Sequence, residues 1–194
     1  RVAEVPRALP TLVAAVAAGG TAAAPGMQPA ATNSGAVLHR IAAAGPDLAR
    51  RVAKVPGALP TLGAALAAGG DPAGPSLQEA SNLSAWALAV IAEAAPDLAR
   101  RVAEAPGARR ALIAAVNHGG STAVQARRAV VAIKTWAESA AAAARRACGY
   151  CGRRANRAAG LRLRVCEGCN KARFCNTECQ RHAWSSHKAA CRAL

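Results

Sequence analysis

Aromatic, acidic and sulfur-containing side chains are scarce in most of this 194-residue sequence. Three tryptophans, one tyrosine and one phenylalanine leave few platforms on which single-stranded nucleic acid stacks. Ten acidic residues stand against 25 basic ones, which gives a formal net charge of +15. The first 147 residues contain no cysteine, so a disulfide framework or a thiolate metal site is excluded from that part of the chain.

Long hydrophobic runs and recognisable catalytic motifs are also missing. The uncharged stretch from Ala8 to Leu38 is broken by three prolines and by Gly19-Gly20, so it does not predict a transmembrane helix. The sequence has no glycine-rich phosphate loop, no nucleophile motif and no paired carboxylates in a recognisable frame. We therefore expect neither enzymatic activity nor a membrane partner.

All seven cysteines lie in the last 50 residues, where a histidine completes a pattern of four ligand pairs. Zinc prefers four nitrogen or sulfur ligands in a tetrahedron, and ligands a few residues apart reach one ion without backbone strain. Eight ligands make two such sites, and an odd number of cysteines argues against a set of disulfides. Because four protein ligands leave no open position, we expect two structural zinc ions. The pairs are Cys148-x2-Cys151, Cys166-x2-Cys169, Cys175-x3-Cys179 and His187-x3-Cys191.

The order of these ligands and the residues beside them resemble the MYND zinc finger over residues 148–191. An aromatic residue, Phe174, precedes the fifth ligand, and the segment closes with the pattern Cys-Gln-x3-Trp-x2-His-x3-Cys. His182 is an alternative ligand, but His187 is the histidine that leaves the x3 gap to Cys191. On a helix, residues four apart project from the same face, which suits a shared metal ion.

The resemblance implies a cross-braced finger with interleaved zinc sites. In such a finger the first and third ligand pairs bind one ion, and the second and fourth pairs bind the other. The resemblance also implies that Gln180 and Trp184 contact a protein partner, with a proline-rich peptide as the expected ligand. Packing in the small core of the finger is the alternative role of Trp184. The first zinc set is Cys148, Cys151, Cys175 and Cys179, and the second is Cys166, Cys169, His187 and Cys191.

One departure from the family is a long insert, residues 152–165, which carries five arginines and predicts a basic loop. Twelve of the 25 basic residues but only two of the ten acidic ones lie in residues 145–194. A compact basic module attracts nucleic acid or an acidic protein surface, although a general bias towards arginine also explains the charge. Nucleic-acid binding by this loop is therefore the main alternative, and it would use Arg153, Arg154, Arg157, Arg162 and Arg164.

The first 144 residues repeat with a period of 50. The copies that begin at Arg1 and Arg51 agree at 16 of their first 20 positions, and the copies at Arg51 and Arg101 agree at 11. Trp86 and Trp136 also lie one period apart. Self-similarity at a fixed period of this length is typical of stacked supersecondary units.

Each copy predicts three helices. A short helix opens at Pro46 or Pro96, where the missing N–H group costs nothing. A second helix ends at a glycine pair such as Gly69-Gly70. A longer third helix covers residues 80–94 in the second copy, with its apolar residues on one face. Loops rich in alanine, proline and glycine separate the second helix from the third.

The second and third helices, residues 55–66 and 80–94, resemble those of an armadillo repeat, and a generic HEAT-like array is the alternative. We therefore expect an all-α fold in two parts. Residues 1–144 would form armadillo-like helical repeats, in about three copies of which the first is incomplete. Residues 148–191 would form the small two-zinc, cross-braced MYND finger.

Together these features favour a zinc-binding protein–protein interaction scaffold, in which the finger binds the partner and the repeats support it. A basic nucleic-acid-binding or transcription-associated module is one alternative, and the regulatory tail of a larger enzyme is another. The sequence does not start with methionine, and its first copy lacks the Pro-Asp-Leu-Ala-Arg lead-in of the later copies, so we expect the sequence to be a piece of a longer protein. Reduced cysteines in zinc sites favour an intracellular setting, in the nucleus or the cytoplasm.

Overall fold

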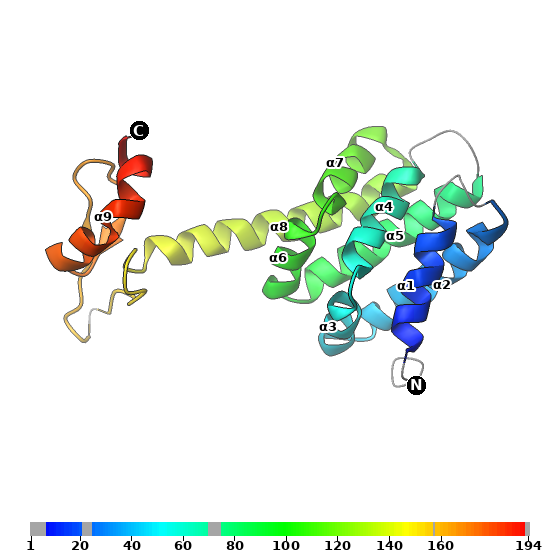
Figure 1. The fold of residues 1–194 in the computed structure, drawn as a ribbon, viewed down its shortest axis with the longest axis horizontal. Helices are drawn as coiled ribbons and strands as arrows, with labels where there is room; N and C mark the ends of the chain where they lie inside the picture. The colour runs from blue at the N-terminus through cyan, green and yellow to red at the C-terminus, as the bar shows by residue number, and fades with distance from the viewer. Residues whose placement is uncertain (1–6, 21–24, 70–74, 157, 193–194) are drawn as a thin grey trace. The chain divides into compact units, whose positions relative to one another are not determined.

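A computed structural model describes residues 7–20, 25–69, 75–156 and 158–192 of the chain. Contacts between residues divide the chain into two units, Arg1–Trp136 and Ala137–Leu194 (Figure 1). The division falls within one long helix, so each unit contains part of that helix.

The first unit is an array of helices in which the 50-residue sequence period becomes a structural period. Short helices begin at the two predicted prolines, and each is followed by a second and a third helix. A 3₁₀ turn, η2 (Pro25–Met27), precedes the third helix of the first copy. The short helices are α3 (Pro46–Lys54) and α6 (Pro96–Glu104), the second helices are α1 (Ala8–Gly19), α4 (Ala58–Ala68) and α7 (Ala108–His118), and the third helices are α2 (Gln28–Ala43), α5 (Pro75–Ala94) and α8 (Gly120–Arg145).

Proline and glycine set the boundary between the short helix and the second helix. α3 ends at Lys54 because the next residue, Val55, precedes a proline and is held in the extended region, with φ −62° and ψ 126°. Gly57 then turns the chain with φ +78° before α4 begins. Arg7 holds the equivalent position before α1 with φ +70°, a conformation that costs a non-glycine residue about 1–2 kcal/mol.

The ends of the second helices match the sequence prediction, but the third copy lacks the predicted loop. α4 ends one residue before Gly69, and α7 ends one residue before Gly119. In the third copy α8 begins directly at Gly120, so no loop separates its second and third helices. In the first two copies, residues 21–24 and 70–74 of these loops lie outside the described residues.

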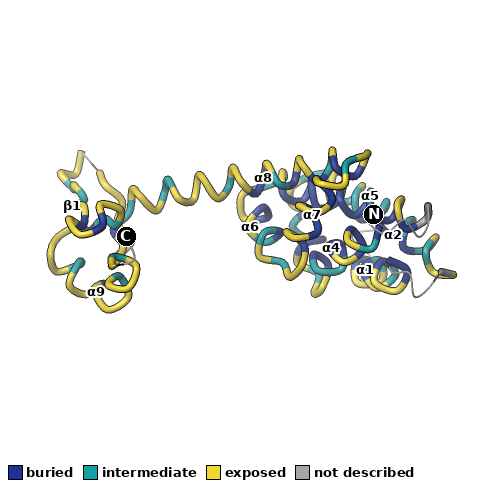
Figure 2. The backbone as a smooth tube through the Cα atoms, turned by 90° about the horizontal axis from the view of Figure 1, so that it is seen from above, coloured by how far each residue is buried: buried dark blue, intermediate teal, exposed yellow. Residues whose placement is uncertain are grey.

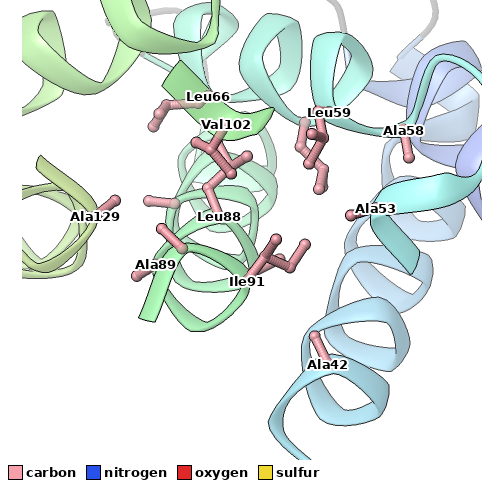
Figure 3. Packing of buried hydrophobic residues seen from close by; sticks show 14 of the residues in the cluster. Ala42, Ala53, Ala58, Leu59, Leu66, Leu88, Ala89, Ile91, Val102 and Ala129 are labelled. Carbon is pink, nitrogen blue, oxygen red and sulfur yellow. The ribbon is translucent and has the colours of Figure 1, made fainter. Parts of the chain in front are cut away.

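α5 lies at the centre of the first unit and supplies much of its core. It packs against α2, α4 and α6, and its Leu88 and Ile91 side chains are fully buried (Figure 3). Small residues let the neighbouring helices approach closely: a Cβ atom on Gly63 would lie 2.8 Å from the Cα of Ala108. The many buried alanines, such as Ala89, serve the same close packing.

Polar contacts connect successive copies of the repeat. The Arg128 guanidinium in α8 donates two hydrogen bonds to the Glu93 carboxylate in α5, at 2.9 and 2.6 Å. The Arg101 guanidinium in α6 donates to the backbone oxygen of Ala53, in the last turn of α3, at 3.0 Å. These contacts favour one stacking register between copies. The helical array is compatible with the predicted armadillo-like repeats. The specific likeness to armadillo repeats stays a prediction.

Among the described residues, no helix is both long enough and apolar enough to cross a membrane.

The second unit contains the exposed end of α8, a two-stranded sheet and the helix α9 (Thr177–Arg192). The strands β1 (Arg164–Val165) and β2 (Arg173–Phe174) pair antiparallel, with Arg164 opposite Phe174. This sheet was not predicted from the sequence. Phe174 is 2% exposed, and most of the remaining backbone of this unit is exposed (Figure 2). So small an apolar core does not by itself account for a stable fold.

Candidate metal centres

The first predicted ligand set comes together in the second unit. Cys148, Cys151, Cys175 and Cys179 offer four sulfur atoms that all lie within 4.8 Å of one another. The sulfur atoms of Cys151 and Cys175 are 3.5 Å apart, although the two residues are 24 positions apart in sequence.

The second predicted ligand set forms an equivalent cluster from Cys166, Cys169, His187 and Cys191. The Nε2 atom of His187 lies 3.4 Å from the sulfur of Cys166 and 3.6 Å from that of Cys169. The sulfur atoms of Cys166 and Cys191 are 3.9 Å apart. The first and third ligand pairs therefore form one centre, and the second and fourth pairs form the other. This is the interleaved arrangement that the family resemblance implied.

Both clusters have the dimensions of a tetrahedral zinc site. Sulfur atoms about 2.3 Å from a zinc ion in a tetrahedron are about 3.8 Å from one another, and a histidine nitrogen at about 2.0 Å shortens the edges it shares. The observed sulfur–sulfur distances of 3.5 and 3.9 Å and nitrogen–sulfur distances of 3.4 and 3.6 Å fit this geometry. All seven cysteines are free thiols. The two clusters fit two zinc ions.

Backbone geometry aims the ligands at each centre. The backbone N–H of Cys175 donates to the sulfur of Cys148 at 3.4 Å, which fixes an acceptor lone pair of that ligand. Gly168 leaves space in the other centre, because a Cβ atom there would lie 3.0 Å from the sulfur of Cys191. Asn176 caps α9: its side-chain oxygen accepts the backbone N–H of Cys179 at 2.8 Å. The sequence carried a signal for this cap, since asparagine directly before a helix favours the position.

One thiol in each centre ionises easily. Burial opposes ionisation of Cys148, but backbone N–H groups, including those of Cys151 and Tyr150, outweigh it and lower the pKa of the thiol to about 6. Backbone N–H groups, with that of Ala172 first among them, lower the pKa of the Cys169 thiol to about 6. Each centre therefore presents a thiolate that attracts a cation at neutral pH.

Other thiols in the same centres hold their protons firmly. Burial, followed by hydrogen bonds and charge from neighbouring thiols, raises the pKa of Cys175 to about 12 and that of Cys191 to about 11. The same causes raise the pKa of Cys179. The four thiols of the first centre and the three of the second are too close together to ionise fully on their own, and a divalent ion supplies the charge that lets them do so.

The structure distinguishes the two histidines of α9. His187 belongs to the second cluster, and its ring also meets the buried Phe174 ring edge to face at 5.6 Å. His182 lies outside both clusters, stacks on Tyr150 at 5.1 Å and approaches the Glu178 carboxylate at 3.9 Å. The prediction that His187 is the ligand is therefore confirmed.

The two predicted partner-contacting residues lie on the same face of α9 as His187. Trp184 is 39% exposed, and its ring centroid lies 6.0 Å from that of His187. Gln180 is half-buried, and its amide nitrogen lies 3.7 Å from the sulfur of Cys166. Gln180 therefore contacts the metal centre itself, a role that was not predicted from the sequence.

The arginines of the predicted basic loop are mostly exposed. Arg153, Arg154, Arg162 and Arg164 are exposed, and Arg157 lies outside the described residues. Within the loop, Asn156 and Leu161 exchange two backbone hydrogen bonds, at 3.0 and 2.8 Å.

Comparison with known proteins agrees with this geometry. Residues 148–191 match the family model described as MYND finger. No curated protein and no solved structure gives a match to the chain. The matched segment includes all eight ligands of the two clusters and ends before the last three residues of the chain.

Proposed function

We propose that this chain is a non-catalytic interaction scaffold, in which the zinc finger binds a segment of a partner protein and the helical repeats support it. MYND fingers are zinc-binding domains that typically mediate protein interactions, which favours this class of function. Both clusters hold four protein ligands each, so neither leaves a position for a substrate on the metal. The zinc ions then act by folding the finger and fixing its surface.

The exposure of Trp184 is the observation that carries this proposal. A tryptophan that only filled the finger core would be buried, whereas Trp184 is 39% exposed beside the metal ligand His187. α9 carries three of the eight ligands, so bound zinc would hold the helix and present the ring on a rigid element at low entropic cost. Tryptophans in such positions supply much of the binding free energy at protein interfaces.

A proline-rich peptide suits the neighbourhood of Trp184 and Gln180. Such a peptide adopts the polyproline II helix, whose rings pack on an aromatic face and whose carbonyl oxygens have no internal donors. One amide hydrogen of Gln180 is directed at the sulfur of Cys166. The amide group retains a second hydrogen and its oxygen for the peptide backbone.

Titration of the zinc-loaded chain with a fluorescent proline-rich peptide tests this proposal. Trp184→Ala should weaken binding about tenfold or more, because an interface tryptophan contributes roughly 2 kcal/mol. His182→Ala is the matched control: it removes a ring from another face of α9 and should change the affinity less than about twofold. Zinc content and the circular dichroism spectrum must be unchanged in both variants. Equal affinity of Trp184→Ala and the unmodified chain would refute the proposed peptide binding at Trp184.

A further inference from the structure

Four arginines line a pocket of about 650 Å³ in the second unit. Arg145 and Arg146 come from the end of α8, Arg162 from the basic loop and Arg173 from β2. The other lining residues are alanines and leucines. The pocket therefore combines strong positive charge with apolar walls.

No carboxylate neutralises this pocket within the part of the chain that the structure describes. None of the lining residues is acidic, and none of the four arginines forms an ion pair among the described residues. Guanidinium groups remain charged at every physiological pH. Four of them around one volume repel one another, so the pocket favours an anion.

Arg173 supplies an unused hydrogen-bond donor. Its Nε atom is buried and has no hydrogen-bond partner. Its backbone is held by β2 and by a hydrogen bond from the backbone N–H of Gly149 to its carbonyl oxygen, at 2.8 Å. A buried donor without an acceptor is costly and rare in folded proteins, so Arg173 carries unused hydrogen-bonding capacity in the wall of the pocket.

The end of α8 does not account for the arginine pair. Basic residues in a last helical turn often hydrogen-bond to free carbonyl oxygens. Here the carbonyl oxygens of Ala143, Ala144 and Arg146 already accept backbone N–H groups, at 3.1 Å each. Arg145 and Arg146 make no side-chain hydrogen bond of this kind among the described residues.

We propose that this pocket binds the phosphate group of a phosphorylated side chain on a partner protein. A phosphate monoester carries nearly two negative charges and three acceptor oxygens, and the fork of an arginine pairs with two of these oxygens at once. The alanines and leucines of the wall pack against the apolar stem that carries the phosphate. This pocket and the Gln180–Trp184 surface share no residue, so each inference stands or falls without the other.

A nucleic-acid backbone fits this pocket less well. Binding to a backbone needs basic side chains that follow a track of phosphodiesters, with aromatic rings for the bases of a single strand. The four arginines instead line one pocket, and no aromatic residue lines it.

The experiment follows the arginine Nε–Hε signals of the ¹⁵N-labelled, zinc-loaded chain by NMR while acetylated phosphoserine amide is added at constant ionic strength. A saturable shift of the Arg173 signal is expected. Arg146→Gln and Arg162→Gln should each weaken binding about tenfold, the loss of a hydrogen bond between charged groups. Arg153→Gln and Arg154→Gln remove the same charge outside the pocket and should change binding less than about twofold.

Dimethyl phosphate and a single-stranded oligothymidylate, added in separate titrations, test the nucleic-acid alternative. Both should bind more weakly than the phosphoserine amide, and unphosphorylated serine amide should not bind. Tighter binding of either diester would overturn the proposal in favour of nucleic acid. Equal losses of affinity in all four variants would show that binding depends only on the overall positive charge, which would overturn the proposal. The absence of any saturable shift would overturn it as well.

Discussion

The Nε2 atom of His187 lies 3.4 Å from the sulfur of Cys166, across 21 residues that include two ligands of the other metal centre. Those two ligands, Cys175 and Cys179, share the first centre with Cys148 and Cys151. Cys148 and Cys151 come before every ligand of the second centre in the sequence. Neither zinc site is therefore a separate local loop. Each closes around part of the other.

Interleaving predicts that one lost ligand empties both centres. Cys175→Ala removes a ligand of the first centre and His187→Ala a ligand of the second. Binding of structural zinc contributes on the order of 10 kcal/mol to folding, so either loss should unfold the whole finger. Zinc content measured after dialysis should fall to near zero per chain in both variants. His182→Ala, a histidine outside both clusters, should keep the full content.

Retention of one zinc ion by either ligand variant would contradict this prediction. It would show that the two centres fold independently in spite of their interleaved order.

Zinc binding should release protons, and its affinity should fall as pH falls. At about pH 7.5 the Cys148 and Cys169 thiols, with pKa values of about 6, are already ionised. The pKa is raised at Cys175 and Cys179 in the first centre and at Cys191 in the second, so zinc must displace at least two protons from one centre and one from the other. Because two protons are released, the affinity of the first centre for zinc should fall about 100-fold for each unit by which the pH is lowered.

Isothermal titration calorimetry in buffers of different ionisation enthalpy measures these protons directly. The apparent enthalpy of zinc binding should change in proportion to the buffer enthalpy. The same enthalpy in all buffers would mean that the thiols lose no protons, and it would exclude the charge arrangement described for the two clusters.

Removal of the cap on α9 should weaken metal binding without removing a ligand. Asn176→Ala deletes the acceptor of the Cys179 backbone N–H, at a cost of about 1 kcal/mol, and α9 carries Cys179, His187 and Cys191. The zinc affinity measured by chelator competition should fall about fivefold. Asn156→Ala is the matched control, because its side-chain oxygen accepts the N–H of Ala159 in a loop without ligands. The prediction fails if the two variants bind zinc equally well.

Sequence patterns predicted the features that depend on short spacing. The prolines at Pro46 and Pro96 marked helix starts, and the x3 gap before Cys191 selected His187 over His182. Both are local constraints on the backbone, so they can be read without knowledge of the tertiary contacts.

Features that depend on distant contacts were not predicted. The strands β1 and β2 are two residues each, too short for any periodicity to appear in the sequence. The buried Nε of Arg173 and the contact between Gln180 and Cys166 arise from packing across the finger. The fusion of the third-copy loop into α8 had a local sequence signal that the prediction overlooked, because residues 121–145 contain neither the proline nor the glycine that follow Gly20 and Gly70 in the other copies.

Native mass spectrometry of the full chain tests the central claim most directly. The two clusters predict a mass increase that corresponds to two zinc ions per chain, with all eight ligands engaged and no disulfide formed. Titration with a chelator should convert the two-zinc species into the metal-free chain with little one-zinc intermediate, because the centres are interleaved. A stoichiometry of one zinc ion per chain, or a stable one-zinc species across the titration, would contradict the account.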